Sequence, residues 1–470
     1  MTASDSAQLT IVVGLARSGI GVARLLQAQG RAVRLIESKD TPELQVKAKT
    51  LRAEGIDVKL GVPLALEALE PLPDDTAVVV SPGIRWDHPA LVALRERGVR
   101  VQGDLLPAWR ASGSTRWIGI TGTNGKTTVT HLVSHLLEQA GLNAPMGGNV
   151  GFSGAELVLE RCVEAPQPPD WLVMEMSSYQ IEASPQIAPA VGIWTTLTPD
   201  HLERHGTVDD YRAIKRGLLE RSGVRILNAD DPDLRAHAGT WQQPVQWITA
   251  GPREALPSGF DPLLWIDQQR VWQRGENGAP PIDLMDANCL SMPGDHNRQN
   301  MLMAAAAGLQ AGLSGPVMEQ AFRAFPGVPH RLERIREHGG IHWFNDSKAT
   351  NYDAAEVALK ALEGPLVALA GGQSKIGDAA AWVAALKTKA AAVVLFGAAI
   401  EEFNRLLQEG GYGGDVHHCP GLAEAVPLAA ELAPTLGCSA VLLSPACASF
   451  DQYSDFEARG DHFRQLVLAL

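Results

Sequence analysis

Short apolar runs rich in β-branched residues alternate with longer stretches of helical period along most of the chain. In the first hundred residues these runs are Leu9–Val13, Ala32–Glu37 and Ala77–Ser81, each of a length suited to one strand. Helix-like stretches separate them. Strands that alternate with helices are typical of a parallel α/β sheet, so the sequence predicts such a domain at the N-terminus.

The alternation resumes twice further along the chain. A strand is predicted at Arg116–Thr121, and the next helix has one apolar stripe, formed by Val129, Leu132, Val133, Leu136 and Leu137. Later strands are predicted at Leu366–Ala370, Ala392–Phe396 and Ala440–Leu443. The segment Gly251–Ala287 is rich in Pro, Gly and Trp and lacks a helical period, which indicates short strands and loops.

Two interruptions divide these blocks. A mixed stretch lies at 102–115, and the run Pro326-Gly327-Val328-Pro329 breaks the helical pattern. We therefore expect three α/β domains at 1–104, 105–327 and 328–470, of which the first and third are Rossmann-like. The length of 470 residues agrees, because single cores stop growing at roughly 250–300 residues.

Composition narrows the class of protein. A formal net charge of −13 argues against a general nucleic-acid binder, because a polyanion would be repelled. The five cysteines are scattered without a C-x-x-C pair, which indicates reduced thiols and no zinc site. We see no secretory signal and no apolar run long enough to span a bilayer. These features predict a cytoplasmic protein without a membrane span, and we expect a monomer.

A glycine-rich loop gives the strongest chemical signal. It joins the strand Arg116–Thr121 to the helix with the apolar stripe and consists of Gly122, Thr123, Asn124, Gly125, Lys126, Thr127 and Thr128. Loop amides and a helix N-terminus bind phosphate, a lysine balances its charge, and a threonine hydroxyl can ligate Mg²⁺. The sequence predicts a P-loop ATPase-like central domain that binds a nucleoside triphosphate. An ordinary βα turn is the alternative.

Acidic and basic groups follow at the ends of later apolar runs. Glu175 ends one such run, and Asp200-His201 follows another, where an α/β sheet binds its ligands. Glu175 is placed to hold Mg²⁺ against a triphosphate. Taken alone, Asp200-His201 favours a structural interpretation. Because the phosphate loop and Glu175 are predicted at the same edge of the sheet, the functional interpretation is favoured. Lys215 lies in a helix predicted from Tyr211 and would by composition be a surface lysine.

Several further segments allow both a structural and a functional interpretation. Asn297 and Asn300 precede an Ala-rich helix predicted from about Met301, which their side chains could cap. Asp346-Ser347-Lys348 could be turn chemistry alone. At the N-terminus, Gly14–Gly19 is a G-x-A-x-x-G variant of the dinucleotide fingerprint with Glu37 after the next strand. That pattern leaves open an NAD site, another nucleotide site or a turn without ligand.

Three segments together resemble one family. The runs Thr-Gly-Thr-Asn-Gly-Lys-Thr-Thr at 121–128, Asn-Asp-Ser-Lys-Ala-Thr-Asn at 345–351 and Ser-Pro-Ala-Cys-Ala-Ser at 444–449 resemble the Mur ligases, which include the folylpolyglutamate synthetases. The resemblance extends from about Leu9 to Phe463 and is weaker in the first domain. It implies an ATP-dependent ligase that joins a carboxylate to an amine through an acyl phosphate and releases ADP.

The resemblance also implies roles for individual residues. The catalytic groups would be Lys126, Glu175, His201 and Lys215. Besides the loop, the ATP contacts would be Asn297, Asn300, Arg331 and Asp346. Two Mg²⁺ ions would be held by Thr127, Glu175, His201 and Lys215, the last as a carbamate formed from CO₂. The uridine-nucleotide substrate would meet Leu15, Ala16, Arg17, Ser18, Gly19, Glu37, Ser81, Gly83, Asn149 and His201. Glutamate would be held by Lys348, Thr350, Lys375, Ser449, Phe450 and Phe456.

The substrates implied are UDP-N-acetylmuramoyl-L-alanine and glutamate, whose chirality the gripping residues leave open. Another Mur ligase or a folylpolyglutamate synthetase would use the same chemistry on a different acid or amine. A P-loop NTPase without ligase activity would leave the third domain unexplained. An NAD-dependent dehydrogenase would use Gly14–Gly19 and would bind nicotinamide cofactor without ATP hydrolysis.

Overall fold

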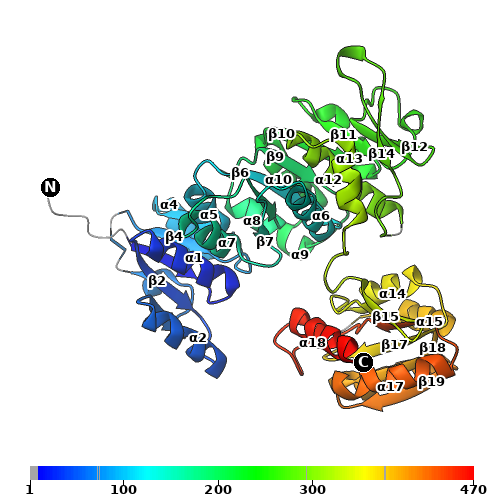
Figure 1. Ribbon diagram of the computed structural model, residues 1–470. Coiled ribbons are helices and arrows are strands. Elements are labelled where there is room, and N and C mark those ends of the chain that lie inside the picture. Colours follow the sequence, from blue (N-terminus) through cyan, green and yellow to red (C-terminus); the bar gives the residue numbers. More distant parts are fainter. Residues whose placement is uncertain (1–8, 71, 74, 293, 375–376) are drawn as a thin grey trace. The chain divides into compact units, whose positions relative to one another are not determined.

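The computed structural model describes residues 9–70, 72–73, 75–292, 294–374 and 377–470 (Figure 1). The chain forms two compact units, Met1–Phe325 and Pro326–Leu470. Among the described residues the first unit has a 5-stranded and a 9-stranded sheet, and the second unit has a 6-stranded sheet. None of the described helices combines the length and the apolar character needed to cross a membrane.

The N-terminal sheet has the order β3-β2-β1-β4-β5, and all its strands are parallel. Its strands are β1 (Leu9–Val13), β2 (Ala32–Glu37), β3 (Asp57–Leu60), β4 (Ala77–Val80) and β5 (Arg100–Gly103). Its helices are α1 (Arg17–Ala28), α2 (Pro42–Ala53), α3 (Leu66–Leu69), α4 (Pro89–Glu96) and α5 (Leu105–Ala111). The carboxyl ends of β1, β2 and β4 therefore meet at one edge of the sheet, where the predicted nucleotide turn lies.

The second sheet has the order β14-β13-β12-β11-β10-β9-β6-β8-β7. Its strands are β6 (Arg116–Thr121), β7 (Met146–Gly148), β8 (Trp171–Glu175), β9 (Val191–Trp194), β10 (Val224–Asn228), β11 (Gln246–Thr249), β12 (Leu264–Asp267), β13 (Arg270–Gln273) and β14 (Ile282–Asp286). Strand β6 lies between β8 and β9, so the predicted phosphate loop lies beside the ends of two strands with polar residues.

Eight α-helices of the described chain belong to this part. They are α6 (Lys126–Gln139), α7 (Gly154–Val158), α8 (Ser178–Ala183), α9 (Leu202–His205), α10 (Val208–Arg221), α11 (Pro232–Ala236), α12 (Asp295–Gln310) and α13 (Gly315–Arg323). Two helices begin earlier than the sequence indicated. Helix α12 begins at Asp295 instead of near Met301, and α10 begins at Val208 instead of Tyr211, because Gly294 and Thr207 occupy the N-cap positions.

The second unit has the sheet order β15-β16-β20-β17-β18-β19, parallel except for the edge strand β15. Its strands are β15 (Glu333–His338), β16 (Ile341–Asn345), β17 (Leu366–Gly371), β18 (Ala390–Phe396), β19 (Asp415–Cys419) and β20 (Ala440–Leu443). Its helices are α14 (Tyr352–Ala361), α15 (Ala380–Lys389), α16 (Ile400–Glu409), α17 (Leu422–Thr435) and α18 (Phe456–Ala469). The predicted α/β fold class is confirmed in all three sheets.

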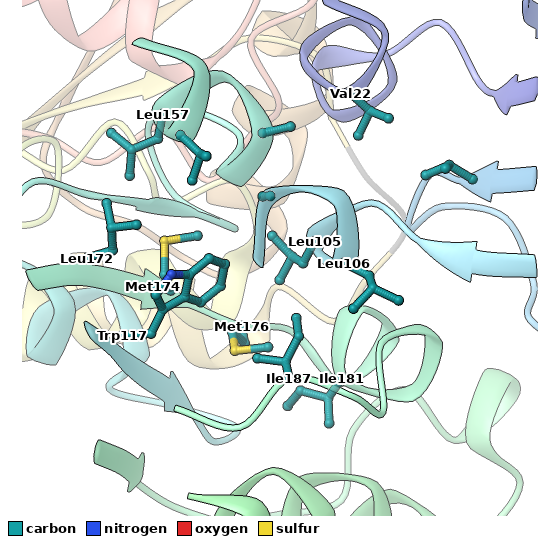
Figure 2. Packing of buried hydrophobic residues seen from close by; sticks show 14 of the residues in the cluster. Val22, Leu105, Leu106, Trp117, Leu157, Leu172, Met174, Met176, Ile181 and Ile187 are labelled. Atoms are coloured by element: carbon teal, nitrogen blue, oxygen red, sulfur yellow. The ribbon is translucent and has the colours of Figure 1, made fainter. Parts of the chain in front are cut away.

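One apolar cluster joins the first two sheets. It includes Val22 of α1, Leu105 of α5, Leu157 of α7 and Trp117 of β6, all buried (Figure 2). The packing is close, because a Cβ added at Gly154 would lie 2.5 Å from Leu105 Cδ2. A shared core explains why both sheets belong to one compact unit.

Gly19 should be intolerant of a side chain. A Cβ added there would lie 1.9 Å from the carbonyl oxygen of Gly14, which is backbone and cannot turn aside. We expect Gly19→Ala to destabilise the protein by roughly 1–3 kcal/mol or more, the cost of overpacking. Urea unfolding followed by circular dichroism measures this change.

Gly217→Ala in α10 is the matched control. Its added methyl group would meet only the far end of Arg221, and alanine favours the helix by up to about 1 kcal/mol. Equal unfolding midpoints for the two variants would contradict the proposed close approach at Gly19.

Candidate active site

The phosphate loop depends on two glycines. Gly122 and Gly125 have φ values of 146° and 84°, which strain any other residue. A Cβ added at Gly122 would lie 1.9 Å from Thr195 Oγ1, and one at Gly125 would lie 2.7 Å from Asn300 Oδ1. Gly125 is the N-cap of α6, and no described side chain caps that helix. The N-terminus of α6 is therefore arranged for an anion.

The residues after β9 hold this loop from the side. The amide of Thr123 donates to Thr196 O at 2.8 Å, and the amide of Asn124 donates to Thr196 Oγ1 at 3.0 Å. The hydroxyl of Thr195 donates to Asn124 O. No role was predicted for Thr195 and Thr196, although they lie in the same short segment as Asp200-His201. Their hydrogen bonds hold the backbone of the loop against the end of β9.

Lys126 lies over the loop. Its Nζ donates to Gly122 O at 3.0 Å and to Thr123 O at 2.9 Å. Thr127, in the first turn of α6, is buried. A lysine and a helix N-terminus thus lie at the same loop, which is the arrangement that binds phosphate.

Glu175 ends β8, directly beside β6, and its side chain is buried. Its Oε1 accepts a hydrogen bond of 2.9 Å from Asn149 Nδ2. Its Oε2 is also buried and has no hydrogen-bond partner among the described residues. A buried carboxylate oxygen is costly unless a cation or a donor meets it, so this oxygen fits a metal ion such as Mg²⁺.

His201 lies at the start of α9 with a left-handed φ of 54° and a partly exposed side chain. Its Nε2 is 3.4 Å from Asp200 Oδ2, and its ring lies 5.2 Å from that of Tyr179. In the described part of the chain no group of three or more His, Cys, Asp or Glu side chains could hold a metal ion. A site made of Glu175 and His201 would need the hydroxyl and lysine ligands that the resemblance implies.

His205 was not singled out in the sequence. Its Nε2 lies 2.9 Å from Ser178 Oγ, and burial lowers its pKa to about 4, helped by the charge of Arg204. His205 is therefore neutral near pH 7 and links α9 to α8, the helix after Glu175.

Lys215 is buried, which overturns its interpretation as a surface lysine. Its Nζ donates to Gly122 O at 3.0 Å and to Thr121 Oγ1 at 3.3 Å, and it lies 4.5 Å from the centre of the Tyr211 ring. Burial, and next the charge of Lys126, lower the pKa of Lys215 well below its usual range. Tyr211 and Lys215 are four residues apart in α10 and so lie on the same face of the helix. That face carries the amine to the phosphate loop.

Asn297 and Asn300 do not cap a helix. Both lie inside the first turns of α12, whose N-cap is Gly294, and both are buried. Asn300 Nδ2 donates to Asn297 Oδ1 at 3.4 Å, and Asn300 Oδ1 lies against Gly125. The structure thus brings Asn300 to the phosphate loop, and the capping interpretation is wrong.

The N-terminal turn lies beside a cavity of about 460 Å³. The cavity is lined by Val13, Gly14, Ile36, Glu37, Ser38, Val62, Pro63, Leu64, Gly83, Ile84, Arg85 and His88. Glu37 Oε2 accepts a hydrogen bond of 3.0 Å from the Leu15 amide. Burial alone would raise the pKa of Glu37, but hydrogen bonds from the Leu15 and Lys39 amides lower it overall. Ser81 Oγ is buried beside Gly14 and has no partner among the described residues.

Ser18 connects this turn to the second sheet. Its hydroxyl donates to Asp104 Oδ2, which also accepts from Gln180 Nε2 at 3.2 Å. Burial raises the pKa of Asp104. Gln180 forms a capping box with Ser177 at the start of α8. The sequence pointed to a domain boundary near Asp104 but not to this connection.

Arg204 makes a second connection. Its guanidinium donates to Ile84 O at 3.1 Å and to Glu182 Oε2 at 3.3 Å, and it stacks on Tyr179 at 4.3 Å. The cavity wall at Ile84 is thereby joined to α8 and α9, the helices that follow Glu175 and His201.

In the second unit, the predicted residues follow the ends of neighbouring strands. Asp346 follows β16 and is buried; it accepts hydrogen bonds of 3.1 Å each from the Leu332 amide and Ser444 Oγ. Lys348 Nζ lies 5.7 Å from the centre of the Phe456 ring. Of the other predicted residues, Arg331 and Phe450 are exposed, Thr350 is partly exposed, Ser449 is buried, and Lys375 lies outside the described residues.

A three-domain α/β chain with a phosphate loop and a buried acid beside it defines a nucleotide-dependent enzyme of the P-loop class. Three family models match: the Mur ligase MurD-like N-terminal domain at 8–103, the Mur ligase middle domain at 120–308 and the Mur ligase glutamate ligase domain at 330–447. The chain belongs to the Mur ligase family, as its motifs predicted.

Relatives match over nearly the whole chain. The UDP-N-acetylmuramoylalanine--D-glutamate ligase of Synechococcus sp. strain CC9902 is 55% identical over 98% of both chains. That of Microcystis aeruginosa is 46% identical over 98% of this chain and 99% of its own. Among solved structures, UDP-N-acetylmuramate-alanine ligase from Thermotoga maritima has a TM-score of 0.55 at 17% identity, over 98% of this chain and 99% of its own. That likeness shows the fold.

Family membership settles the type of reaction. The chain is an ATP-dependent ligase that forms an amide bond, as predicted. A P-loop NTPase without ligase activity and an NAD-dependent dehydrogenase are therefore set aside.

Asp346 should make stability depend on pH. Burial raises its pKa to about 7, despite hydrogen bonds from the Leu332 amide and Ser444. Between about pH 4 and 7 the unfolded state loses this proton before the folded state does, so the stability contributed by the proton falls as pH rises. The natural protein should lose unfolding free energy on the order of 3 kcal/mol across that range, and Asp346→Asn should not show this loss.

Thermal unfolding without nucleotide, at steps from pH 4 to 7.5, measures the difference between the two proteins. Ser444 can rotate its hydroxyl to accept from the new amide. Asp353→Asn, an exposed acid in α14, is the control and should show no such trend. A stability difference between Asp346→Asn and the natural protein that is constant with pH would contradict the prediction.

Proposed function

We propose that this enzyme adds D-glutamate to UDP-N-acetylmuramoyl-L-alanine, a step of peptidoglycan synthesis. The observation that carries the proposal is 55% identity, over 98% of both chains, to a relative named for that reaction. The alanyl carboxylate attacks the γ-phosphorus of ATP and ADP leaves. The glutamate amine then attacks the acyl phosphate, loses a proton and expels phosphate, and the amide remains.

In this proposal ATP binds with its phosphates at Gly122–Thr128. Lys126 already lies over the loop and would move onto the phosphates when they arrive. Asn297 and Asn300 would meet adenine; Asp346 would meet the ribose, and Arg331 would stabilise the charge on the transferred phosphoryl group. The contact between Asn300 and Gly125 supports an adenine position next to the loop.

Two Mg²⁺ ions are proposed at the same edge of the sheet, where they would neutralise charge on the phosphates and the carboxylate. Thr127 and Glu175 would hold one ion, and His201 with a carbamate on Lys215 would hold the other, with Glu175 in between. The Oε2 of Glu175 supports this set, because it is buried and no described residue hydrogen-bonds to it.

Carbamylation of Lys215 is proposed on chemical grounds. A lowered pKa leaves more of the amine unprotonated, and a neutral amine attacks CO₂ to give a carbamate and one proton. The amine also faces a like charge on Lys126. A carbamate would exchange this repulsion for an attraction and would supply oxygen ligands at a position that otherwise repels metal ions.

The proposed division of labour follows the domains, with the uridine nucleotide at 1–104, ATP at 105–327 and glutamate at 328–470. The cavity beside Glu37 and Gly83 suits a uracil ring, since apolar residues line much of it and Glu37, Ser38, Arg85 and His88 add polar groups. The turn Leu15–Gly19 would bind the diphosphate, with Ser81 nearby. Asn149 and His201 would lie near the sugar.

For the amino acid, we propose that Lys348, Thr350, Lys375, Ser449, Phe450 and Phe456 hold the two carboxylates of glutamate. L-Glutamate, or the amine of another Mur ligase, is the alternative. The groups that bind carboxylates discriminate weakly between enantiomers, so the stereochemical assignment rests on the named relatives.

The reaction is tested by phosphate release from Mg-ATP with UDP-N-acetylmuramoyl-L-alanine. Separate assays contain D-glutamate, L-glutamate or no amino acid. We expect release with D-glutamate alone, because the amine is needed to consume the acyl phosphate. Dependence on L-glutamate would change the stereochemistry, and no release with either would contradict the substrate assignment.

Carbamylation is tested by Lys215→Ala. We expect activity to fall by about a hundredfold or more, because the metal set loses a ligand, and to recover in part with added acetate or formate. Lys126→Ala is the control: it loses a cation, so a carboxylate should not restore it. A carbamate carbon signal from ¹³C-bicarbonate should be present in the natural protein and absent from Lys215→Ala. No rescue and no signal would contradict the carbamate.

A further inference from the structure

Arg459 is the largest buried charge that the proposed reaction leaves without a role. It lies in α18, and 0% of its surface is exposed. Removing a guanidinium from water is expensive, and proteins usually compensate with a carboxylate. Here all five hydrogen bonds go to neutral oxygens. Such a group demands an explanation beyond stability.

These hydrogen bonds reach three separate segments. Nε donates to Ser347 Oγ at 3.0 Å, and one terminal nitrogen donates to Ser347 O at 2.8 Å and Cys447 O at 3.0 Å. The other terminal nitrogen donates to Ala448 O at 3.2 Å and Gly371 O at 3.4 Å. Ser347 follows β16, Cys447 and Ala448 follow β20, and Gly371 is the last residue of β17; these three strands are neighbours in the sheet. One side chain therefore sets the spacing of three adjacent loops.

The same segments carry the residues proposed to hold glutamate. Ser347 precedes Lys348, and Ala448 precedes Ser449. Ser347 Oγ in turn donates to Phe456 O at 2.8 Å. Two backbone hydrogen bonds, of 2.8 and 2.9 Å, also join Gln373 to Ala448. A shift of the Arg459 guanidinium would therefore displace the backbone next to Lys348, Ser449 and Phe456 together.

We propose that Arg459 is the positioning residue of the amino-acid site: it fixes the three loops that grip glutamate and adds a buried positive charge beneath its two carboxylates. This inference rests on the proposed function. Burial lowers the pKa of Arg459 only to about 10, so the group stays charged near neutral pH. A lysine cannot reproduce the role, because its single nitrogen cannot serve three segments at fixed angles.

The test compares Arg459→Lys with the natural protein. The KM for glutamate should rise by about tenfold or more, whereas the KM values for ATP and the uridine substrate should stay within about twofold. Arg459→Met, which also removes the charge, should raise the KM for glutamate further if it folds. Hydrogen exchange at the Gly372, Gln373 and Ala448 amides should speed up in Arg459→Lys.

Arg464→Lys is the matched control. Arg464 lies in the same helix and pairs with Glu333 at 2.8 Å, so its loss should lower the melting temperature without changing the KM for glutamate. A lower melting temperature with an unchanged KM for glutamate in Arg459→Lys would overturn the proposal. An equal rise of KM in both variants would overturn it too.

Failure of the proposed function gives a different result. The natural protein would then release no phosphate with either glutamate enantiomer. Hydrogen exchange would still decide whether Arg459 holds the loops, and unchanged exchange at the three amides in Arg459→Lys would overturn that part.

Discussion

The phosphate loop depends on hydrogen bonds from its neighbours, and residues at the ends of adjacent strands and helices supply them. Backbone amides and carbonyl oxygens inside a protein need partners, and a loop has no regular secondary structure to provide them. Thr196 accepts hydrogen bonds from the amides of Thr123 and Asn124, while Lys126 and Lys215 both donate to Gly122 O. The order β9-β6-β8 makes this possible, because it places the polar ends of two strands on either side of the loop.

Two basic side chains of the molecule are buried. Lys215 in the first unit and Arg459 in the second are each held by neutral oxygens instead of a carboxylate. Each arrangement costs stability, because desolvation is only partly offset by hydrogen bonds. In both cases the nitrogen lies near the carboxyl edge of a sheet, where the proposed ligands would bind. The chain thus gives up stability at the two places where buried basic groups are proposed to serve its chemistry.

The first two sheets work as one body because their core is continuous. Leu105 shares a core with residues of α7 and β6. Asp104 also connects Ser18 to Gln180, and Arg204 connects Ile84 to α8. The proposed nucleotide turn and the proposed metal edge therefore share a rigid frame. Such a frame suits a reaction in which the alanyl end of a long substrate must meet the γ-phosphate, since misplacement of the reacting atoms slows catalysis steeply.

The three α/β blocks, the phosphate loop and the family could all be predicted from the sequence, because strand periodicity, glycine spacing and short motifs are local properties. The sequence also placed Glu175 correctly at a strand end. It did not determine that Lys215 is buried, that Asn300 lies against Gly125, or that Arg459 joins three loops, because each of these depends on which strands become neighbours. Helix starts at Asp295 and Val208 were missed because the N-caps there are decided by the packed chain. Burial and convergence are properties of the tertiary structure, since they arise only when distant segments exclude water together.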